Sequence, residues 1–354
     1  MSQGNYRQQV AERFQRGDSP ALRKILQAAM SEEEARFLLD LPAPTPDLAA
    51  KYGVDQPAVE DKLLGLARRG LVILSPHGLQ LPEDLVMLHD GIMSSAPEYV
   101  PAGIDKLWME FYDGEGWAND IGNALASFPL PIVRSIPIPT SIGADTVLLP
   151  QENLAEIFRA HADLIAVRPC CCRMAAKKCD HPIQTCIHFG ARGEFDLRRG
   201  SGKKVSADEA ISIALAAIDT GLVPMVSNGS DVKALDFMCL CCGCCCVGLN
   251  PGQRLGVLHK IMAPSRFVST VAGDKCIACE ACVERCTINA ISMQDGIALV
   301  DRSKCLGCGA CISSCPVDDV MAMELVRPPE FIPEKVFVPS MLAVGDAVSS
   351  AGSK

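Results

Sequence analysis

Apolar positions between residues 20 and 81 recur with a helical period and then give way to short alternating stretches. The pattern predicts helices over residues 20–29, after a capping box of Ser31 and Glu34, after Asp47 as a cap, and over residues 56–69, closed by Gly70. Residues 71–74 and 78–81 are predicted to be paired strands. This order favours a winged-helix-like module over residues 19–90, preceded by an arm or marginal helix at residues 1–18.

A helical connector is expected over residues 91–132. It contains an aromatic group that favours a packing seam between domains over a ligand site. The members of this group are Trp108, Phe111, Tyr112 and Trp117. The proline-rich stretch 129–139 is predicted to end the connector.

The pattern of residues 133–272 predicts an α/β domain. Its expected elements are a helix over 151–162, a buried strand over 164–167, a helix opened by the capping box of Ser206 and Glu209, and a strand over 222–227. Two cysteine-rich groups are predicted to follow strands, where α/β sheets usually place their sites. The whole chain is therefore expected to be an α+β or α/β multidomain protein. Residues 326–354 are expected to be an extended tail whose last ten residues are disordered.

Charge and cysteine content narrow the class of protein. The chain of 354 residues has a formal net charge of −9, and residues 1–80 carry ten basic and ten acidic side chains, which argues against a nucleic-acid partner. Nineteen cysteines without a signal peptide favour metal binding in a reducing cytoplasm over disulfides. No apolar run reaches the length of a membrane span.

Residues 273–325 contain the strongest motif in the chain. The spacing C-x2-C-x2-C-x3-C occurs twice, starting at Cys276 and at Cys305, and it is the run with which bacterial-type ferredoxins hold two [4Fe–4S] clusters. The predicted ligands of the first cluster are Cys276, Cys279, Cys282 and Cys315. Those of the second are Cys305, Cys308, Cys311 and Cys286. Paired zinc sites are the alternative, but they rarely need a third cysteine in each arm.

Eleven more cysteines lie upstream in two groups. The first contains Cys170, Cys171, Cys172, Cys179 and Cys186, and the second contains Cys239, Cys241, Cys242, Cys244, Cys245 and Cys246. In the second group Cys239, Cys242 and Cys245 recur every third residue, as do Cys241 and Cys244, and Gly243 is predicted to let the backbone approach inorganic sulfide. All of these except Cys171 are predicted to hold one or two further clusters.

Other occupants of the upstream groups stay open. Zinc at residues 170–186, a redox centre of unusual geometry and dithiol chemistry are the alternatives. Arg173 is expected to donate a hydrogen bond to a cluster or to balance its charge. His181 and His188 are expected to support the site and not to bind metal.

The combined motifs resemble a family of multi-cluster 4Fe–4S proteins common in anaerobes, over about residues 20–325. The resemblance rests on Cys170-x-Cys172-Arg173, on Cys179-x-His181-Pro182-x3-Cys186, on the run from Cys239 to Cys246, and on the dicluster motif. It implies electron transfer but no particular substrate. The chain departs from the usual pattern at Thr287, where proline often follows the fourth cysteine, and at the additional Cys171.

We expect a soluble electron-transfer protein that relays single electrons through its clusters to a partner oxidoreductase containing flavin or metal. An electron-transfer subunit is favoured over a stand-alone catalyst. One alternative is a reductase whose upstream cluster reduces a substrate. The other is an iron–sulfur-sensing, DNA-binding regulator.

Overall fold

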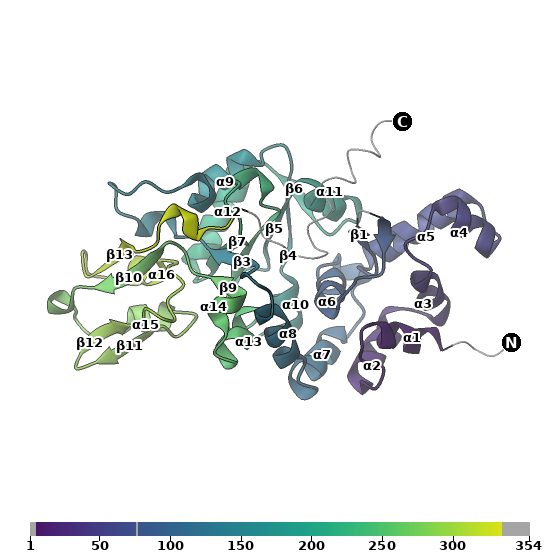
Figure 1. Cartoon of the computed structure of the whole chain (residues 1–354), viewed down its shortest axis with the longest axis horizontal. Coiled ribbons are helices and arrows are strands. Elements are labelled where there is room, and N and C mark those ends of the chain that lie inside the picture. Colours follow the sequence, from purple (N-terminus) through teal and green to yellow (C-terminus); the bar gives the residue numbers. More distant parts are fainter. Residues whose placement is uncertain (1–4, 76, 335–354) are drawn as a thin grey trace.

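The computed structural model describes residues 5–75 and 77–334. Along the chain it passes from a helical N-terminal region, through a central sheet, to a small region of two hairpin-like halves at the opposite end (Figure 1). Helices and strands are mixed throughout, and the strands form one seven-stranded sheet and three two-stranded sheets.

The N-terminal region consists of helices and one short hairpin. Its elements are α1 (Tyr6–Arg13), α2 (Pro20–Ala29), α3 (Glu32–Leu39), α4 (Thr45–Tyr52), α5 (Gln56–Arg68), β1 (Ile73–Ser75), β2 (Gly78–Gln80) and α6 (Leu85–Met93). The capping box of Ser31 and Glu34 is present, and Gly70 follows α5 with a φ of 71°. Asp47 is not a cap, because α4 begins two residues earlier, at Thr45 after Pro44, and Asp47 lies in its first turn.

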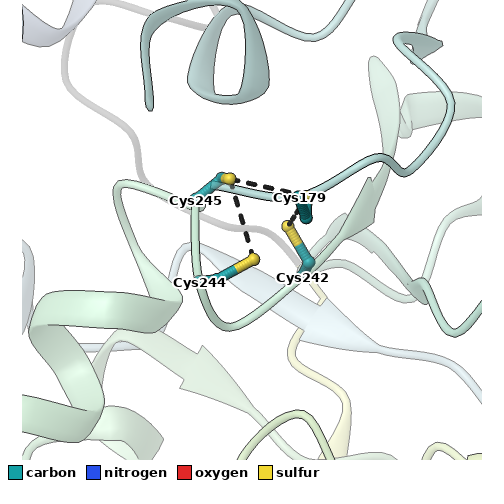
Figure 2. A group of neighbouring side chains, drawn as sticks. All are labelled: Cys179, Cys242, Cys244 and Cys245. Carbon is teal, nitrogen blue, oxygen red and sulfur yellow. Dashed lines mark hydrogen bonds between the residues drawn. The ribbon is translucent and has the colours of Figure 1, made fainter. Parts of the chain in front are cut away.

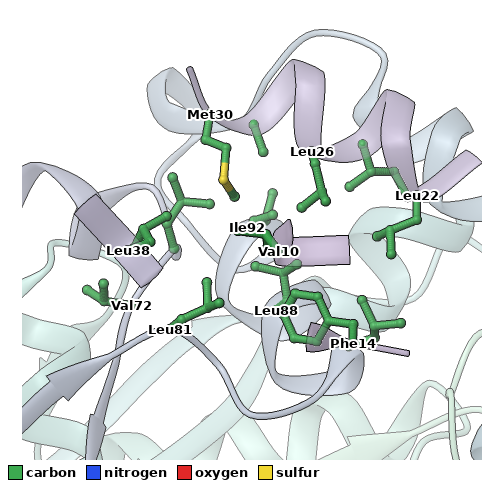
Figure 3. Packing of buried hydrophobic residues seen from close by; sticks show 14 of the residues in the cluster. Val10, Phe14, Leu22, Leu26, Met30, Leu38, Val72, Leu81, Leu88 and Ile92 are labelled. Atoms are coloured by element: carbon green, nitrogen blue, oxygen red, sulfur yellow. The ribbon is translucent and has the colours of Figure 1, made fainter. Parts of the chain in front are cut away.

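A single hydrophobic core joins these helices (Figure 3). Val10 of α1 is fully buried in it, together with Leu22 and Leu26 of α2 and Leu88 of α6. Residues 6–13 are therefore a packed helix, the second of the two expectations for this segment. The winged-helix character of the module remains a prediction, although the helices and the β1–β2 hairpin occur where the pattern placed them.

The connector packs its aromatic side chains into the same core. It contains α7 (Ile104–Met109), a π-turn at Glu110–Gly114 and α8 (Trp117–Ala126). Trp117 stacks on Phe111 with ring centroids 5.0 Å apart, and Trp108 lies 5.4 Å from Trp117. Cys171 and Ala175 belong to this core as well, so the aromatic group joins the N-terminal helices to the cysteine-rich region.

The seven-stranded sheet has the order β6-β4-β5-β8-β7-β3-β9. Its strands are β3 (Val133–Ser135), β4 (Ile165–Pro169), β5 (Gln184–Phe189), β6 (Lys203–Val205), β7 (Val223–Ser227), β8 (Phe237–Cys241) and β9 (Met262–Ala263). All neighbouring pairs are antiparallel except β3 and β9. The α/β domain expected over residues 133–272 is therefore built on a mainly antiparallel sheet.

Alternation along the strands separates the two faces of this sheet. On one face, Ile187, Met238 and Leu240 pack against α9 (Leu154–Ala160) and α12 (Ala207–Asp219). The predicted capping box of Ser206 and Glu209 is present at the start of α12. The remaining helices of the region are α10 (Cys171–Ala176), α11 (Gly190–Arg198), α13 (Leu249–Arg254) and α14 (Leu258–Ile261). Along the strands, the residues between those that pack against the helices, including Cys186 and Cys239, face the other side of the sheet and line a cavity there.

The C-terminal region repeats one unit twice. In the first half β10 (Phe267–Val271), a cysteine loop and α15 (Ala281–Arg285) lead into β11 (Ile291–Gln294); in the second half β12 (Ile297–Val300), a second loop and α16 (Ala310–Ser314) lead into β13 (Met321–Leu325). β10 pairs with β13 and β11 pairs with β12, both antiparallel. Of the predicted tail, residues 326–334 are described and the rest lies outside the described residues. Within the described residues, no helix combines the length and the apolar character needed to cross a membrane.

Candidate metal centres

Four cysteines from both halves of the C-terminal region line one small pocket. They are Cys276, Cys279, Cys282 and Cys315, the set that the spacing predicted for the first cluster. Ile277, Val317 and Met321 form part of the same wall. The pocket lies at the surface, because Cys279 is exposed and the Ile277 side chain is 62% exposed.

The second predicted set lies deeper. The thiol of Cys308 has those of Cys286, Cys305 and Cys311 as its interacting neighbours. Burial raises the pKa of Cys308 strongly and that of Cys311 to about 12. Because a metal ligand must be a thiolate, these thiols release protons when they bind metal. A metal that binds here therefore has to displace the protons of Cys308 and Cys311.

Both cysteine loops have the same backbone shape, although their sequences differ. Ala278 and Glu280 in the first loop have φ values of 56° and 61°, and Gly307 and Gly309 at the equivalent positions have 63° and 78°. Successive residues of this kind turn their N–H groups into a concavity that binds anions, as in many iron–sulfur sites. Both loops thus fit an anionic cluster.

The second loop requires glycine for a further reason. A Cβ on Gly307 would overlap the carbonyl oxygen of Phe267, and one on Gly309 would overlap the Ser141 side chain. The first loop is exposed and accepts the side chains of Ala278 and Glu280 at strained φ values, which is common at functional sites.

A third site joins the two upstream cysteine groups. The sulfurs of Cys179, Cys242, Cys244 and Cys245 all lie within 4.8 Å of one another, and we call these residues the tetrad (Figure 2). The Cys179 Sγ is 3.9 Å from the Cys242 Sγ and 3.6 Å from the Cys245 Sγ, and the Cys244 and Cys245 sulfurs are 3.7 Å apart. A hydrogen bond with Cys245 lowers the pKa of Cys242 to about 4, so one thiolate is available before a metal arrives.

The comparisons with known proteins bear on the C-terminal region. A family model described as a 4Fe–4S dicluster domain matches residues 269–323. The C-terminal region is a ferredoxin-type dicluster domain. Together with the tetrad, it makes the chain an iron–sulfur protein. No curated protein and no solved structure is similar enough to the chain to count as a match.

The remaining upstream cysteines lie apart from the tetrad. Cys170, Cys172, Cys186, Cys239, Cys241 and Cys246 line the cavity on the opposite face of the sheet. The predicted series with one cysteine every third residue is thus divided between the cavity and the tetrad. The reason is that Cys239 and Cys241 belong to strand β8, where residues two apart share a face. Cys170 follows its strand, as expected, whereas Cys186 and Cys239 lie within strands. Cys171 has Cys172 as its nearest sulfur, 3.8 Å away.

Arg173 lies between the tetrad and the cavity. Its Nη1 donates to the Leu240 carbonyl at 2.9 Å and is 3.8 Å from the Cys242 Sγ. Burial alone would lower the pKa of Arg173, but the neighbouring thiols of Cys170 and Cys242 outweigh burial and raise it. This contact supports the predicted charge-balancing role.

Neither candidate histidine lies in the tetrad. His181 Nδ1 is 3.2 Å from the Thr220 hydroxyl. His188 Nδ1 is 2.5 Å from the Asp196 carboxylate, while its Nε2 is 3.2 Å from Arg168 and 3.8 Å from the Cys186 Sγ. This buried network was not predicted, although the alternation of Arg168, Cys186 and His188 along β4 and β5 carried a signal for it.

Thr287 connects the dicluster domain to the tetrad loop. The Gly243 N–H donates to the Thr287 hydroxyl at 2.5 Å, and the Gln253 amide donates to the Thr287 carbonyl at 3.1 Å. A Cβ on Gly243 would overlap that carbonyl oxygen. Residue 243 must therefore be glycine because the backbone of Thr287 lies so close to it. At position 287, threonine supplies a hydroxyl group that proline would lack.

We expect Gly243→Ala to lower the free energy of unfolding by about 1–3 kcal/mol, because the added methyl group overpacks a backbone contact. Thermal unfolding under anaerobic conditions measures the effect. Gly65→Ala is the control: this glycine lies inside α5, and a methyl group added there would have no other atom within 4 Å, so alanine should stabilise the helix by about 0.5–1 kcal/mol. Equal effects of the two substitutions would contradict the contact.

Proposed function

We propose that the protein transfers single electrons, taking them up at the surface cluster and passing them inward through the second cluster to the cysteine-rich domain. Cys276, Cys279, Cys282 and Cys315 would hold the first cluster, and Cys305, Cys308, Cys311 and Cys286 the second. Bound clusters supply the one-electron chemistry, and the surrounding residues set their potentials through burial, hydrogen bonds and charge.

The observation that carries this proposal is the graded burial of the two thiol sets. The first set opens to the surface around Ile277, while Cys305 and Cys311 of the second set are buried. Cys308 contacts hydrophobic clusters that include both the tetrad cysteines and Cys239, Cys241 and Cys246. The second set therefore lies beside cysteines of both upstream groups.

The surface around the first set supports a protein partner. Ile277 is surrounded in sequence by the exposed side chains of Asp274, Glu280 and Glu284. Apart from the exposed Lys275, the charged side chains exposed near Ile277 in sequence are acidic, which suits a redox enzyme, with flavin or metal, that offers a basic rim. By contrast, α5 exposes Glu60 and Asp61, so the DNA-binding alternative gains no support.

The tetrad would hold one tetrahedral ion, either zinc or iron. Four thiolates about 2.3 Å from one ion lie about 3.8 Å apart. Three pairs of tetrad sulfurs are 3.6–3.9 Å apart, and all pairs lie within 4.8 Å. Among the described residues, only the tetrad brings three or more possible ligands so close together, so the dicluster thiols are more widely spread. The tetrad ion would tie the 179 loop to the 242–245 loop.

The test is Cys279→Ala, which removes a ligand from the surface cluster. We expect loss of up to about four irons and much slower reduction of the remaining centres by a reduced flavoprotein in anaerobic stopped-flow experiments. The matched control is Cys171→Ala, which removes a thiol that lines the upstream cavity but belongs to no proposed ligand set. It should leave the iron of the dicluster domain and its rate of reduction unchanged. Unchanged reduction kinetics in Cys279→Ala would refute entry at the surface cluster.

A further inference from the structure

Six upstream thiols form a group of their own, separate from the tetrad. Cys186 and Cys239 are direct partners across two neighbouring strands. Cys170, Cys172, Cys241 and Cys246 line the same cavity as this pair. We call these residues the six-thiol group.

All six line one cavity of about 510 Å³, as does Cys171, and no tetrad cysteine does. This volume falls within the range of about 300–1,000 Å³ typical of ligand and cofactor sites. Apolar side chains such as Val86, Phe128, Met225 and Met262 form much of the remaining wall. The cavity is therefore large enough for a cofactor.

The fold explains how these thiols meet. Cys186 and Cys239 are directly paired across β5 and β8, and Cys241 follows on the same face of β8. Cys170 and Cys172 come from the start of α10, and Cys246 follows the turn that carries the tetrad cysteines. Strands, helix and loop thus deliver sulfur from three directions.

The N-terminal module forms part of the wall of this cavity. Val72, Leu74 and Met87 line it, and Asp90 of α6 accepts two hydrogen bonds from Arg168 at 2.7 and 2.8 Å. Arg168 in turn contacts His188, which lies beside Cys186. This buried cationic side chain is placed to offset negative charge that thiolates and sulfide would bring into the cavity.

A single ion does not suit this group. No three of the six sulfurs, all of them among the described residues, lie within 4.8 Å of one another, in contrast to the tetrad. A [4Fe–4S] cluster takes four cysteines, and six are present here. We propose that the six-thiol group holds a sulfide-bridged iron centre larger than one cubane, shielded from solvent by the N-terminal module.

The position of this centre extends the electron path. Cys239, Cys241 and Cys246 contact the same hydrophobic cluster as Cys286, Cys305 and Cys308 of the second dicluster set. The claim that this centre accepts electrons from the dicluster domain rests on the proposed function. The claim about which metals it contains does not, since metal content and spectrum are measured without any electron donor protein.

Two serine substitutions three residues apart distinguish the two upstream sites. Cys241→Ser alters the six-thiol group and Cys244→Ser alters the tetrad, and each is made in the full chain, purified anaerobically and analysed for iron, zinc and acid-labile sulfide with EPR of the reduced form. In the unsubstituted protein we expect more than about twelve irons in addition to any iron held by the tetrad: about eight in two cubanes and more than about four in the six-thiol group.

We expect Cys241→Ser to lose iron, sulfide and one EPR component while the dicluster signals and the tetrad ion remain. Cys244→Ser should lose one metal ion and no sulfide. About eight irons in the unsubstituted protein would overturn the site, and about twelve would overturn its size. Equal losses in the two variants would overturn the separation of the six-thiol group from the tetrad. Unchanged electron entry combined with any of these results would leave the proposed function standing.

Discussion

Cys308→Ala is expected to remove about four irons and their sulfide from the chain, because Cys308 supplies a ligand to the second dicluster site. The first site, with Cys276 and Cys279 at the surface, should keep its cluster. Electrons should then enter the protein but fail to reach the upstream centre. Metal analysis combined with rapid-freeze EPR after mixing with a reductant measures both effects.

Electrons should fail to reach the upstream centre in this variant because of the position of Cys308. Its side chain contacts both upstream hydrophobic clusters, and its carbonyl oxygen accepts a 2.8 Å hydrogen bond from the Ile138 N–H. Among the described cysteines of the dicluster domain, only Cys308 contacts the hydrophobic cluster that contains the tetrad cysteines. A full iron complement in Cys308→Ala, with Cys171→Ala as the control, would contradict the ligand assignment.

Arg168→Ala should be the most destabilising substitution outside the metal centres. The Arg168 side chain is 2% exposed, donates to Asp90 and lies 3.6 Å from the Asp196 carboxylate. Removing it leaves the Asp90 carboxylate without its hydrogen-bond donor and takes a positive charge away from Asp196, which should cost about 3–5 kcal/mol. Anaerobic thermal or denaturant unfolding measures this cost.

A surface ion pair provides the matched control. Arg198 is 72% exposed and pairs with Glu194 at 2.7 Å, one turn away, so Arg198→Ala should cost only about 0.3–0.5 kcal/mol. Comparable costs for the two arginines would show that the buried network contributes no more than a surface pair.

The pH dependence of the Arg168 effect follows from Asp90. Burial would raise the pKa of Asp90, but Arg168 outweighs burial and holds it well below its usual range. A lowered carboxylate pKa contributes stability above the unfolded value, about 3.9, and loses it as the pH falls. The difference between wild type and Arg168→Ala should therefore be constant at neutral pH and shrink in acid.

Local patterns predicted the parts of the fold that depend on neighbours in sequence. The capping boxes at Ser31 and Ser206 and the paired cysteine runs of the dicluster domain belong to this kind. Their geometry is determined within a few residues by hydrogen bonds or by loop spacing, so sequence alone is sufficient.

The upstream sites depend on strand register, which spacing does not reveal. Cysteines at three-residue intervals suggested one loop, but β8 extends to Cys241 and gives Cys239 and Cys241 a common face. The neighbouring Cys242 begins the turn that reaches Cys179 from another segment. The sequence FMCLC contained the necessary alternation, and giving it priority over the three-residue series would have separated the two groups.

The role of Thr287 could not be predicted for a related reason. Its partner, Gly243, is 44 residues away and lies in a different domain. Comparison with the usual cysteine run identified Thr287 as a departure. Only the packing of the dicluster domain against the tetrad loop shows that its hydroxyl accepts a hydrogen bond from Gly243.

The most direct test of electron transfer is an anaerobic reductive titration of the full chain, followed by EPR. We predict one-electron reduction of both dicluster centres, with spectra broadened by their mutual proximity, and loss of that broadening in Cys308→Ala. Absence of a reducible iron–sulfur signal, with zinc at the dicluster cysteines, would contradict the proposed electron transfer.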